Sequence, residues 1–362
     1  MNTYKAAVLG ATGMVGQRFI SLLENHPWFT VVTVAASPRS AGKPYAEAVD
    51  GRWAMSTPVP TAVASLTVLA VEADLAAIAA EVDVVFCALD MEKDDIRRIE
   101  DAYAAAGVAV ISNNSAHRWT ADVPMIMPEV NPDHAALIDT QRKNHGWSTG
   151  LVAVKPNCSI QSYVSVLTAL KAFEPTDVAV TSLQAISGAG KTFETWPEMV
   201  DNVIPLIGGE EEKSEKEPMK IWGELSGGAV TFATTPGITA TCIRVPVSDG
   251  HMASVTVRFA CTPSREDILA AIATFQNPLA ELGLPSAPKQ LIHYFEEENR
   301  PQTRLDRDRE NGMGVSMGRL RQLSEHEWQF VALAHNTVRG AAGGAILMAE
   351  LLAAKEYIVH RV

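Results

Sequence analysis

The sequence of 362 residues is poor in cysteine, and its cysteines form no recognisable pattern. The only four, Cys87, Cys158, Cys242 and Cys261, lie far apart, and no pair has CxxC spacing. Four cysteines in a chain of this length are not a disulfide framework. We therefore expect a reducing, cytoplasmic setting. No His or Cys pair has the spacing of metal ligands either, so we expect no metal site.

The sequence also lacks an uncharged apolar stretch of the ~20 residues that a membrane helix needs. The longest candidate, residues 341–354, contains glycines and Glu350 and is typical of a buried helix. The first residues lead directly into an apolar segment without the layout of a signal peptide. These features predict that the chain does not bind membranes.

Basic residues are outnumbered by acidic ones, 30 to 42, which gives a formal net charge of −12. No long basic run is present, so nucleic acid is not an expected partner. An anionic small molecule would have to be held by a few well-placed cations.

Short apolar segments alternate with helical patterns over the first 150 residues. Apolar strands are predicted at residues 6–9, 31–36, 82–88 and 108–111, and a helix at residues 94–106. Continuously apolar strands separated by helices predict an α/β domain with a doubly wound, parallel, Rossmann-type sheet.

A different pattern begins near residue 150. Residues 178–184, 229–233, 239–247 and 253–261 alternate with period two, and helices are predicted at 159–173 and 265–275. This pattern predicts a second, α+β domain with a mostly antiparallel sheet that has one solvent-exposed face. We place the domains at residues 1–155 and 156–335, with a C-terminal helix in residues 336–362 packing back on the first. The acidic run 210–217 is typical of a solvated loop or helix end.

A glycine loop with GxxGxxG spacing follows the first predicted strand. Gly10, Gly13 and Gly16 lie between that strand and a predicted helix. Glycines allow a tight turn, and helix N-terminal amides bind a pyrophosphate. This context favours a dinucleotide site over a simple strand-to-helix turn.

The end of the second predicted strand indicates which dinucleotide is bound. NAD sites usually have an acidic residue there, on the ribose 2′-hydroxyl. Here no carboxylate is present, and Arg39 lies between Ser37 and Ser40. These residues suit a 2′-phosphate and favour NADP, although a surface arginine in a loop would have the same composition.

Cys158 lies between an apolar strand and an apolar helix. A cysteine at a helix N-terminus is expected to have a lowered pKa and to favour the thiolate. Such a thiolate attacks an aldehyde, and the adduct then gives hydride to a nicotinamide. The alternative is a small buried hydrophobic residue.

Four long motifs occur in one order: GATGMVG at 10–16, PNCS at 156–159, QAISGAG at 184–190 and HNTVRGA at 335–341. Together they resemble the aspartate-semialdehyde dehydrogenase family. RPQTRLDRD at 300–308 and VIPLIGGEE at 203–211 resemble its archaeal and fungal branch. The resemblance extends from about residue 5 to 357.

The resemblance implies a role for individual residues. Cys158 matches the nucleophile, His251 the general acid or base, and Gln184 an amide that orients the substrate. Arg244 matches the residue that binds the substrate carboxylate, and Glu210 the one that contacts its amine, although Glu211 and Glu212 remain alternatives. Lys213 and Arg118, with Asn157 beside them, match the phosphate site. The positions implied for the cofactor are Gly10, Thr12, Gly13, Met14, Val15, Ser37, Arg39, Ser40, Ser187, Gly188 and Asn336.

The implied activity is NADP-dependent reduction of 4-aspartyl phosphate to aspartate semialdehyde through a cysteine thioester. It would belong to the biosynthesis of lysine, threonine and methionine, in a homodimer or homotetramer with its dimer contacts in residues 156–335. A malonyl-CoA reductase or related acyl-thioester reductase would share Cys158 and His251. A non-enzymatic NADP sensor is a further alternative.

Overall fold

A computed structural model of the protein describes residues 3–275 and 277–361. Its first sheet is six-stranded, with the order β3-β2-β1-β4-β5-β6 and every pair parallel. The strands are β1 (Tyr4–Leu9), β2 (Phe29–Ala36), β3 (Val68–Ala70), β4 (Val84–Cys87), β5 (Ala109–Ser112) and β6 (Leu151–Val154). This order confirms the predicted Rossmann-type fold, in which ligands bind beyond the carboxyl ends of the strands.

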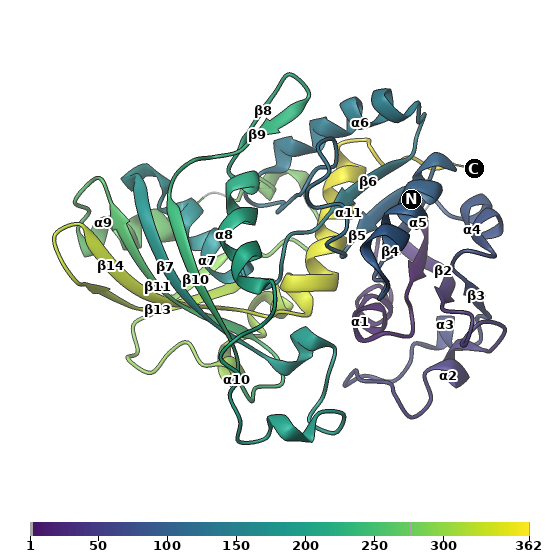
Figure 1. Cartoon of the computed structure of the whole chain (residues 1–362), viewed down its shortest axis with the longest axis horizontal. Helices are drawn as coiled ribbons and strands as arrows, with labels where there is room; N and C mark the ends of the chain where they lie inside the picture. The colour runs from purple at the N-terminus through teal and green to yellow at the C-terminus, as the bar shows by residue number, and fades with distance from the viewer. Residues whose placement is uncertain (1–2, 276, 362) are drawn as a thin grey trace.

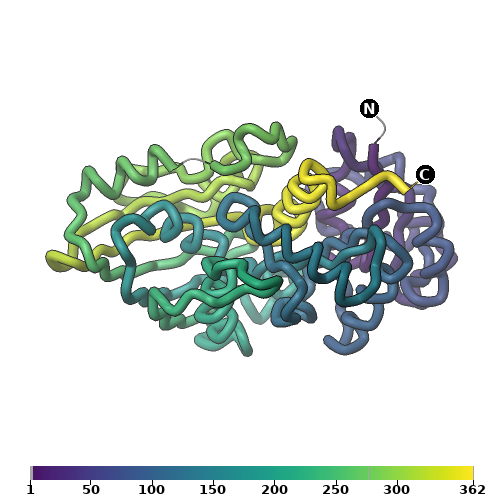
Figure 2. The backbone as a smooth tube through the Cα atoms, turned by 90° about the horizontal axis from the view of Figure 1, so that it is seen from above, coloured from purple at the N-terminus to yellow at the C-terminus, as the bar shows by residue number. Residues whose placement is uncertain are grey.

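Helices cover both faces of this sheet (Figure 1). They include α1 (Met14–Leu22), α4 (Leu75–Glu81), α5 (Lys93–Ala105) and α6 (Leu137–His145), with short helices α2 (Tyr45–Ala48) and α3 (Thr61–Ala64) after β2. The C-terminal helix α11 (Gly343–Ala354) is buried along almost its whole length and contacts α1 and β5. Figure 2 shows it lying against the N-terminal half of the chain. None of the helices in the described ranges is long and apolar enough to cross a membrane.

The second sheet has the order β10-β7-β11-β14-β13-β12. Its strands are β7 (Pro175–Gln184), β10 (Gly237–Arg244), β11 (His251–Phe259), β12 (Ile292–Phe295), β13 (Val315–Gln322) and β14 (Glu327–Ala334). Three pairs are antiparallel, whereas β10 pairs with β7, and β12 with β13, in parallel. The sheet is therefore mixed but mostly antiparallel, as the sequence predicts. Residues 229–233 are not part of it, because β9 (Ala229–Thr231) pairs only with β8 (Glu224–Ser226).

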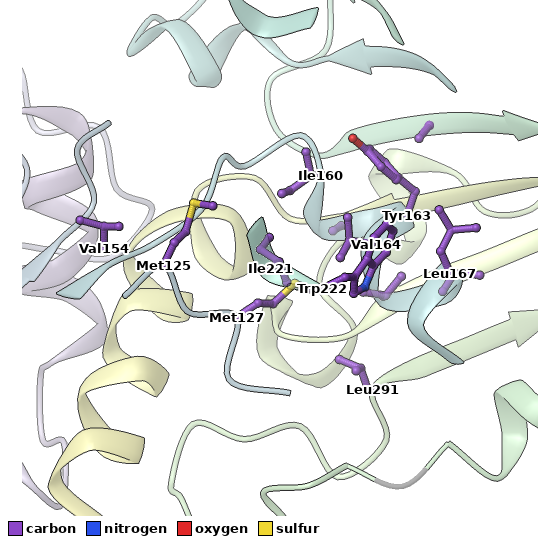
Figure 3. Packing of buried hydrophobic residues seen from close by; sticks show 14 of the residues in the cluster. Met125, Met127, Val154, Ile160, Tyr163, Val164, Leu167, Ile221, Trp222 and Leu291 are labelled. Atoms are coloured by element: carbon purple, nitrogen blue, oxygen red, sulfur yellow. The ribbon is translucent and has the colours of Figure 1, made fainter. Parts of the chain in front are cut away.

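A continuous hydrophobic core joins the two sheets through the segment that carries Cys158. Figure 3 shows Val154 and Met125 at the edge of the first sheet and Tyr163 on α7 (Gln161–Ala169). Trp222, at the end of α8 (Glu210–Ile221), packs into the same core. The chain between β6 and α7 is thereby fixed at the junction of the two halves.

The acidic run 210–217 forms most of helix α8. Glu212 is exposed, but Ser214 and Glu217 are fully buried. The expectation of a solvated segment is wrong for this inner face of α8, because buried polar partners from distant parts of the chain lie against it.

Candidate active site

A cavity of about 370 Å³ collects side chains from both halves of the molecule. It contains most of the residues predicted for chemistry or for the nicotinamide end: Val15, Arg118, Asn157, Cys158, Gln184, Ser187, Gly188, Glu210, Lys213, Arg244 and Asn336. Residues to which the sequence analysis assigned no role complete its lining: Asn113, Asn114, Ser115, Ile207, Thr337, Gly340 and Ala341. The strand ends and loops of two sheets thus meet around Cys158.

The loop that carries Cys158 is held by hydrogen bonds and by a close glycine contact. The side-chain oxygen of Asn157 accepts from both the backbone N–H and the hydroxyl of Ser159, at 2.8 and 2.6 Å. A Cβ atom at Gly340 would lie 2.8 Å from Cβ of Cys158. Only glycine at 340 allows the turn before α11 to approach the cysteine so closely.

Burial dominates the ionisation of Cys158. It raises the pKa of the thiol to about 11, with the Glu210 carboxylate adding to the effect. The cations Lys155, Arg118 and Arg244 lower the pKa but do not offset burial. The expectation of a lowered pKa is therefore wrong, because loss of hydration outweighs the proximity of the α7 N-terminus.

His251 and Arg244 are oriented by a single residue, Ala185. The backbone N–H of Ala185 donates to Nδ1 of His251 at 3.1 Å, and its carbonyl oxygen accepts from Nη1 of Arg244 at 2.7 Å. A Cβ at Gly188 would lie 2.9 Å from that Nη1 and 3.0 Å from Nε2 of His251. Gly188 therefore separates the imidazole from the cavity at close range.

Burial lowers the pKa of His251 to about 3, and the nearby charges of Arg244 and His335 act in the same direction. The imidazole is therefore neutral near pH 7. Its Nε2, like Nε2 of Gln184, is buried without a hydrogen-bond partner among the described residues. Of these two residues only Gln184 lines the cavity, whereas His251 lies directly behind Gly188.

The first turn of α8 closes another side of the cavity. Lys213 pairs with Glu210 at 2.7 Å, and the Asn157 amide donates to both oxygens of Glu210, at 3.0 and 3.1 Å. The neighbouring acids point elsewhere. Glu211 accepts from the backbone N–H of Cys242, and Glu212 pairs with Lys216 at 2.7 Å. Of the three candidate carboxylates, Glu210 lines the cavity.

A second cavity, of about 380 Å³, lies at the carboxyl ends of the first four strands. Gly10, Thr12, Gly13, Ser37 and Arg39 are among the residues that line it, as are Glu72 and Asp90, which the sequence did not single out. Met14 and Ser40 are not part of its lining. The Ser40 hydroxyl is instead a buried acceptor for Nη2 of Arg52, at 3.2 Å.

The glycine loop beside this cavity fits a dinucleotide. Gly10 has a φ of +80°, and a Cβ there would lie 2.2 Å from the carbonyl oxygen of Ala88. A Cβ at Gly16 would lie 2.1 Å from the carbonyl oxygen of Gly10, whereas Gly13 has no contact closer than 3.5 Å. The loop is thus tightly folded yet open at the N-terminus of α1, where a pyrophosphate would bind.

The first turn of α1 connects the two cavities, because Gly13 lines one and Val15 the other. Beyond Val15, Asn336 ties the surrounding loops together. Its amide nitrogen donates to the Ser187 hydroxyl at 2.9 Å, and its oxygen accepts from the backbone N–H of Gly250 at 2.8 Å. The cofactor positions predicted at Ser187, Gly188 and Asn336 therefore lie next to Cys158 rather than beside Arg39.

Comparison with known proteins shows the family to which the chain belongs. Residues 5–138 match the NAD binding domain of semialdehyde dehydrogenases, and residues 167–339 match their dimerisation domain. The aspartate-semialdehyde dehydrogenase of Archaeoglobus fulgidus is 44% identical over 98% of this chain and 99% of that protein. The chain belongs to the aspartate-semialdehyde dehydrogenase family.

Fungal members of the family are similarly close. The aspartate-semialdehyde dehydrogenase of Aspergillus fumigatus is 43% identical over 98% of both chains. A crystal structure of the Candida albicans aspartate-semialdehyde dehydrogenase with NADP superposes with a TM-score of 0.87, at 38% identity, over 99% of this chain and 100% of that one. The predicted resemblance to the archaeal and fungal branch is confirmed.

Proposed function

We propose that this protein is an NADP-dependent aspartate-semialdehyde dehydrogenase that converts 4-aspartyl phosphate to aspartate semialdehyde and phosphate. The observation that carries the proposal is the cavity in which Cys158 lies among Arg244, Arg118 and Lys213. A nucleophile surrounded by several cations suits a substrate with a carboxylate and a phosphate. The NADP-containing relative from Candida albicans supports the cofactor.

In the first step, the Cys158 thiol loses its proton to solvent, and the thiolate, which nearby cations including Lys155 stabilise, attacks the acyl carbon of 4-aspartyl phosphate. A C–S bond forms and the C–O bond to phosphate breaks, which leaves a thioester on Cys158 and free phosphate. Arg244 holds the substrate carboxylate with its planar guanidinium, and Glu210 contacts the amine. Arg118 and Lys213 stabilise the phosphate as it leaves.

In the second step, the thioester is reduced and the semialdehyde is released. The bound cofactor supplies the hydride for this reduction. Because Nδ1 of His251 accepts a hydrogen bond from Ala185, the proton of the neutral imidazole lies on Nε2. Nε2 of His251 and the amide of Gln184 therefore donate toward the oxygen that gains charge. Cys158 leaves as the thiolate when the adduct collapses.

The two predicted domains would have different functions. We propose that residues 1–155, with residues 336–362, bind the cofactor, and that residues 156–335 supply catalysis and the contacts of a homodimer or homotetramer. The match of residues 167–339 to a dimerisation domain supports the second part. We also propose a cytoplasmic location and a role in making the aspartate-derived amino acids.

The test is an assay of NADP reduction with aspartate semialdehyde, with and without phosphate or arsenate. The proposal predicts that NADPH forms continuously only when one of these anions is present. Malonyl-CoA with NADPH provides the comparison, because malonate has no amine for Glu210 to bind. Oxidation of NADPH by malonyl-CoA, with no reaction of the semialdehyde, would contradict the proposal.

A further inference from the structure

Helix α8 carries a buried carboxylate that the proposed chemistry does not use. Glu217 lies seven residues after Glu210, on the same face of the helix, and is fully buried. One of its oxygens accepts from Nη1 of Arg118 at 2.8 Å, and the other accepts from the backbone N–H of Asn157 at 2.6 Å. Both oxygens are thus occupied by charge-assisted hydrogen bonds, which are shorter and stronger than neutral ones.

Arg118 completes a ring of contacts around Pro156. Its Nε donates to the carbonyl oxygen of Lys155 at 3.0 Å. Arg118 and Glu217 therefore hold the backbone on both sides of Pro156, shortly before Cys158. We call this pair of residues the loop clamp. The buried ammonium of Lys220, one turn along α8, donates at 2.8 Å to the carbonyl oxygen of Arg118 itself.

The loop clamp connects two groups that must act on the same substrate. The hydrogen bonds that hold Arg118 in the clamp use Nε and Nη1, while the residue also lines the Cys158 cavity. Cys158 follows Asn157, whose backbone N–H is bound by Glu217. The phosphate and the attacked carbon of an acyl phosphate are joined covalently, so the arginine and the sulfur need a fixed separation.

We infer that Glu217 is a positioning residue that sets the register between the phosphate-binding Arg118 and the nucleophile Cys158, an inference that rests on the proposed function. Glu217 does not line the cavity and therefore does not contact the substrate. One oxygen of its carboxylate holds the Arg118 side chain, and the other holds the backbone N–H of Asn157.

The experiment measures phosphate-dependent turnover of aspartate semialdehyde in Glu217→Gln. Glutamine keeps the shape of the side chain but has one acceptor oxygen for two donors. We expect kcat/KM for phosphate to fall about 30-fold or more, because small displacements of reacting groups are costly. NADP affinity, read by fluorescence titration, should change less than about threefold. Glu212→Gln is the matched control on the exposed face of α8 and should stay within about twofold of the unchanged protein.

Two further variants separate positioning from a general effect on folding. If the clamp acts as a unit, Glu217→Gln combined with Arg118→Ala should be within about threefold of Arg118→Ala alone. Glu217→Asp keeps the charge beside Arg118, but its shorter side chain cannot reach both donors, so we expect an approximately tenfold or larger loss.

Several results would overturn the inference. One is full phosphate-dependent turnover in both Glu217 variants. Another is a loss in the double variant equal to the product of the two single losses. A third is loss of NADP binding in both Glu217 variants, because that result would assign Glu217 to folding. A failure of the unchanged protein to form NADPH from the semialdehyde would instead contradict the proposed function.

Discussion

The backbone N–H of Ala185 donates to Nδ1 of His251 over 3.1 Å. A ring nitrogen that accepts a hydrogen bond carries no proton, so the neutral imidazole is protonated at Nε2. Because burial keeps the pKa of His251 at about 3, this neutral form is the one present near pH 7. His251 therefore enters the reaction as an N–H donor, and a change in the position of that donor should alter the rate.

Two amide substitutions test which nitrogen matters. In His251→Gln the side-chain nitrogen can occupy the position of Nε2, whereas in His251→Asn it occupies that of Nδ1. We expect kcat to fall by roughly 10²–10⁴-fold in His251→Asn, the range for loss of a proton-transferring group. His251→Gln should retain about tenfold more activity than the asparagine variant. Equal or greater activity in His251→Asn would show that Nε2 is not the functional atom.

The same histidine should make the fold sensitive to acid. The pKa of His251 is lowered to about 3, below the ~6.5 of an unfolded histidine, so between these values the unfolded chain binds a proton that the folded chain does not. As the pH decreases below about 6.5, the free energy of unfolding should therefore decrease by up to ~1.4 kcal/mol per pH unit. Urea unfolding at pH 7 and pH 5 measures this slope.

From pH 7 to pH 5, the free energy of unfolding should decrease by about 2 kcal/mol less in His251→Gln than in the unchanged protein. His335, whose pKa burial lowers to about 4, contributes in the same direction in both proteins and cancels from the comparison. His145→Gln is the control at a partly exposed position. An unchanged slope in His251→Gln would mean that the folded and unfolded imidazole bind the proton equally well, which would contradict the lowered pKa of His251.

Lys155 should assist ionisation of the nucleophile. It is buried, its Nζ donates to the Pro156 carbonyl at 3.1 Å, and a Cβ at Gly344 would lie 2.6 Å from its Cε. Burial lowers the pKa of Lys155 to about 7, and the charge of Cys158 is the strongest opposing influence. Lys155→Met should slow alkylation of Cys158 by iodoacetamide by about tenfold at pH 6, where the lysine is charged, and should have much less effect at pH 8, where most of it is neutral.

This experiment needs a Cys261→Ser background, because Cys261 is the exposed cysteine and would react independently. Lys216→Met, at an exposed position on α8, is the control. In both proteins the rate should keep rising above pH 8, since the pKa of Cys158 is raised to about 11. A plateau near pH 6 would contradict the raised pKa, and unchanged kinetics in Lys155→Met would exclude the influence of the lysine.

Arg39 should determine the choice between NADP and NAD. It lines the second cavity with Ser37, and its charge suits a 2′-phosphate. Arg39→Ala should weaken NADP by about 1.5–3 kcal/mol and leave NAD nearly unchanged. Ser40→Ala is a useful comparison, because that hydroxyl contacts Arg52 and lies outside the cavity lining. Equal weakening of both dinucleotides in Arg39→Ala would assign the arginine to the fold.

The first sheet could be predicted from the sequence because buried parallel strands are short, continuous apolar segments. Each predicted strand there overlaps the observed one, as residues 82–88 do with Val84–Cys87. The pairing of the second sheet was not accessible in this way. Period-two alternation identifies β7 and β10 as strands, but it does not reveal that these two strands, separated by helix α8, run parallel.

Most of the site residues that the motifs predict lie together in the structure, but the contacts that support them could not be predicted from the sequence. Glu217 lies in an acidic run, and its partners Arg118 and Asn157 are 99 and 60 residues away in the chain. No local pattern indicates such a partner. The pKa of Cys158 was likewise predicted with the wrong sign, because sequence position indicates a helix terminus but not the degree of burial.

The most direct measurement of the central claim is the site of acylation. The protein is mixed with 4-aspartyl phosphate without NADPH, quenched in acid, and digested for mass spectrometry. We expect one acyl group per chain on the peptide that contains Cys158, none in Cys158→Ser, and slower formation in His251→Asn. Acylation of Cys87, Cys242 or Cys261, with residue 158 unmodified, would contradict the account.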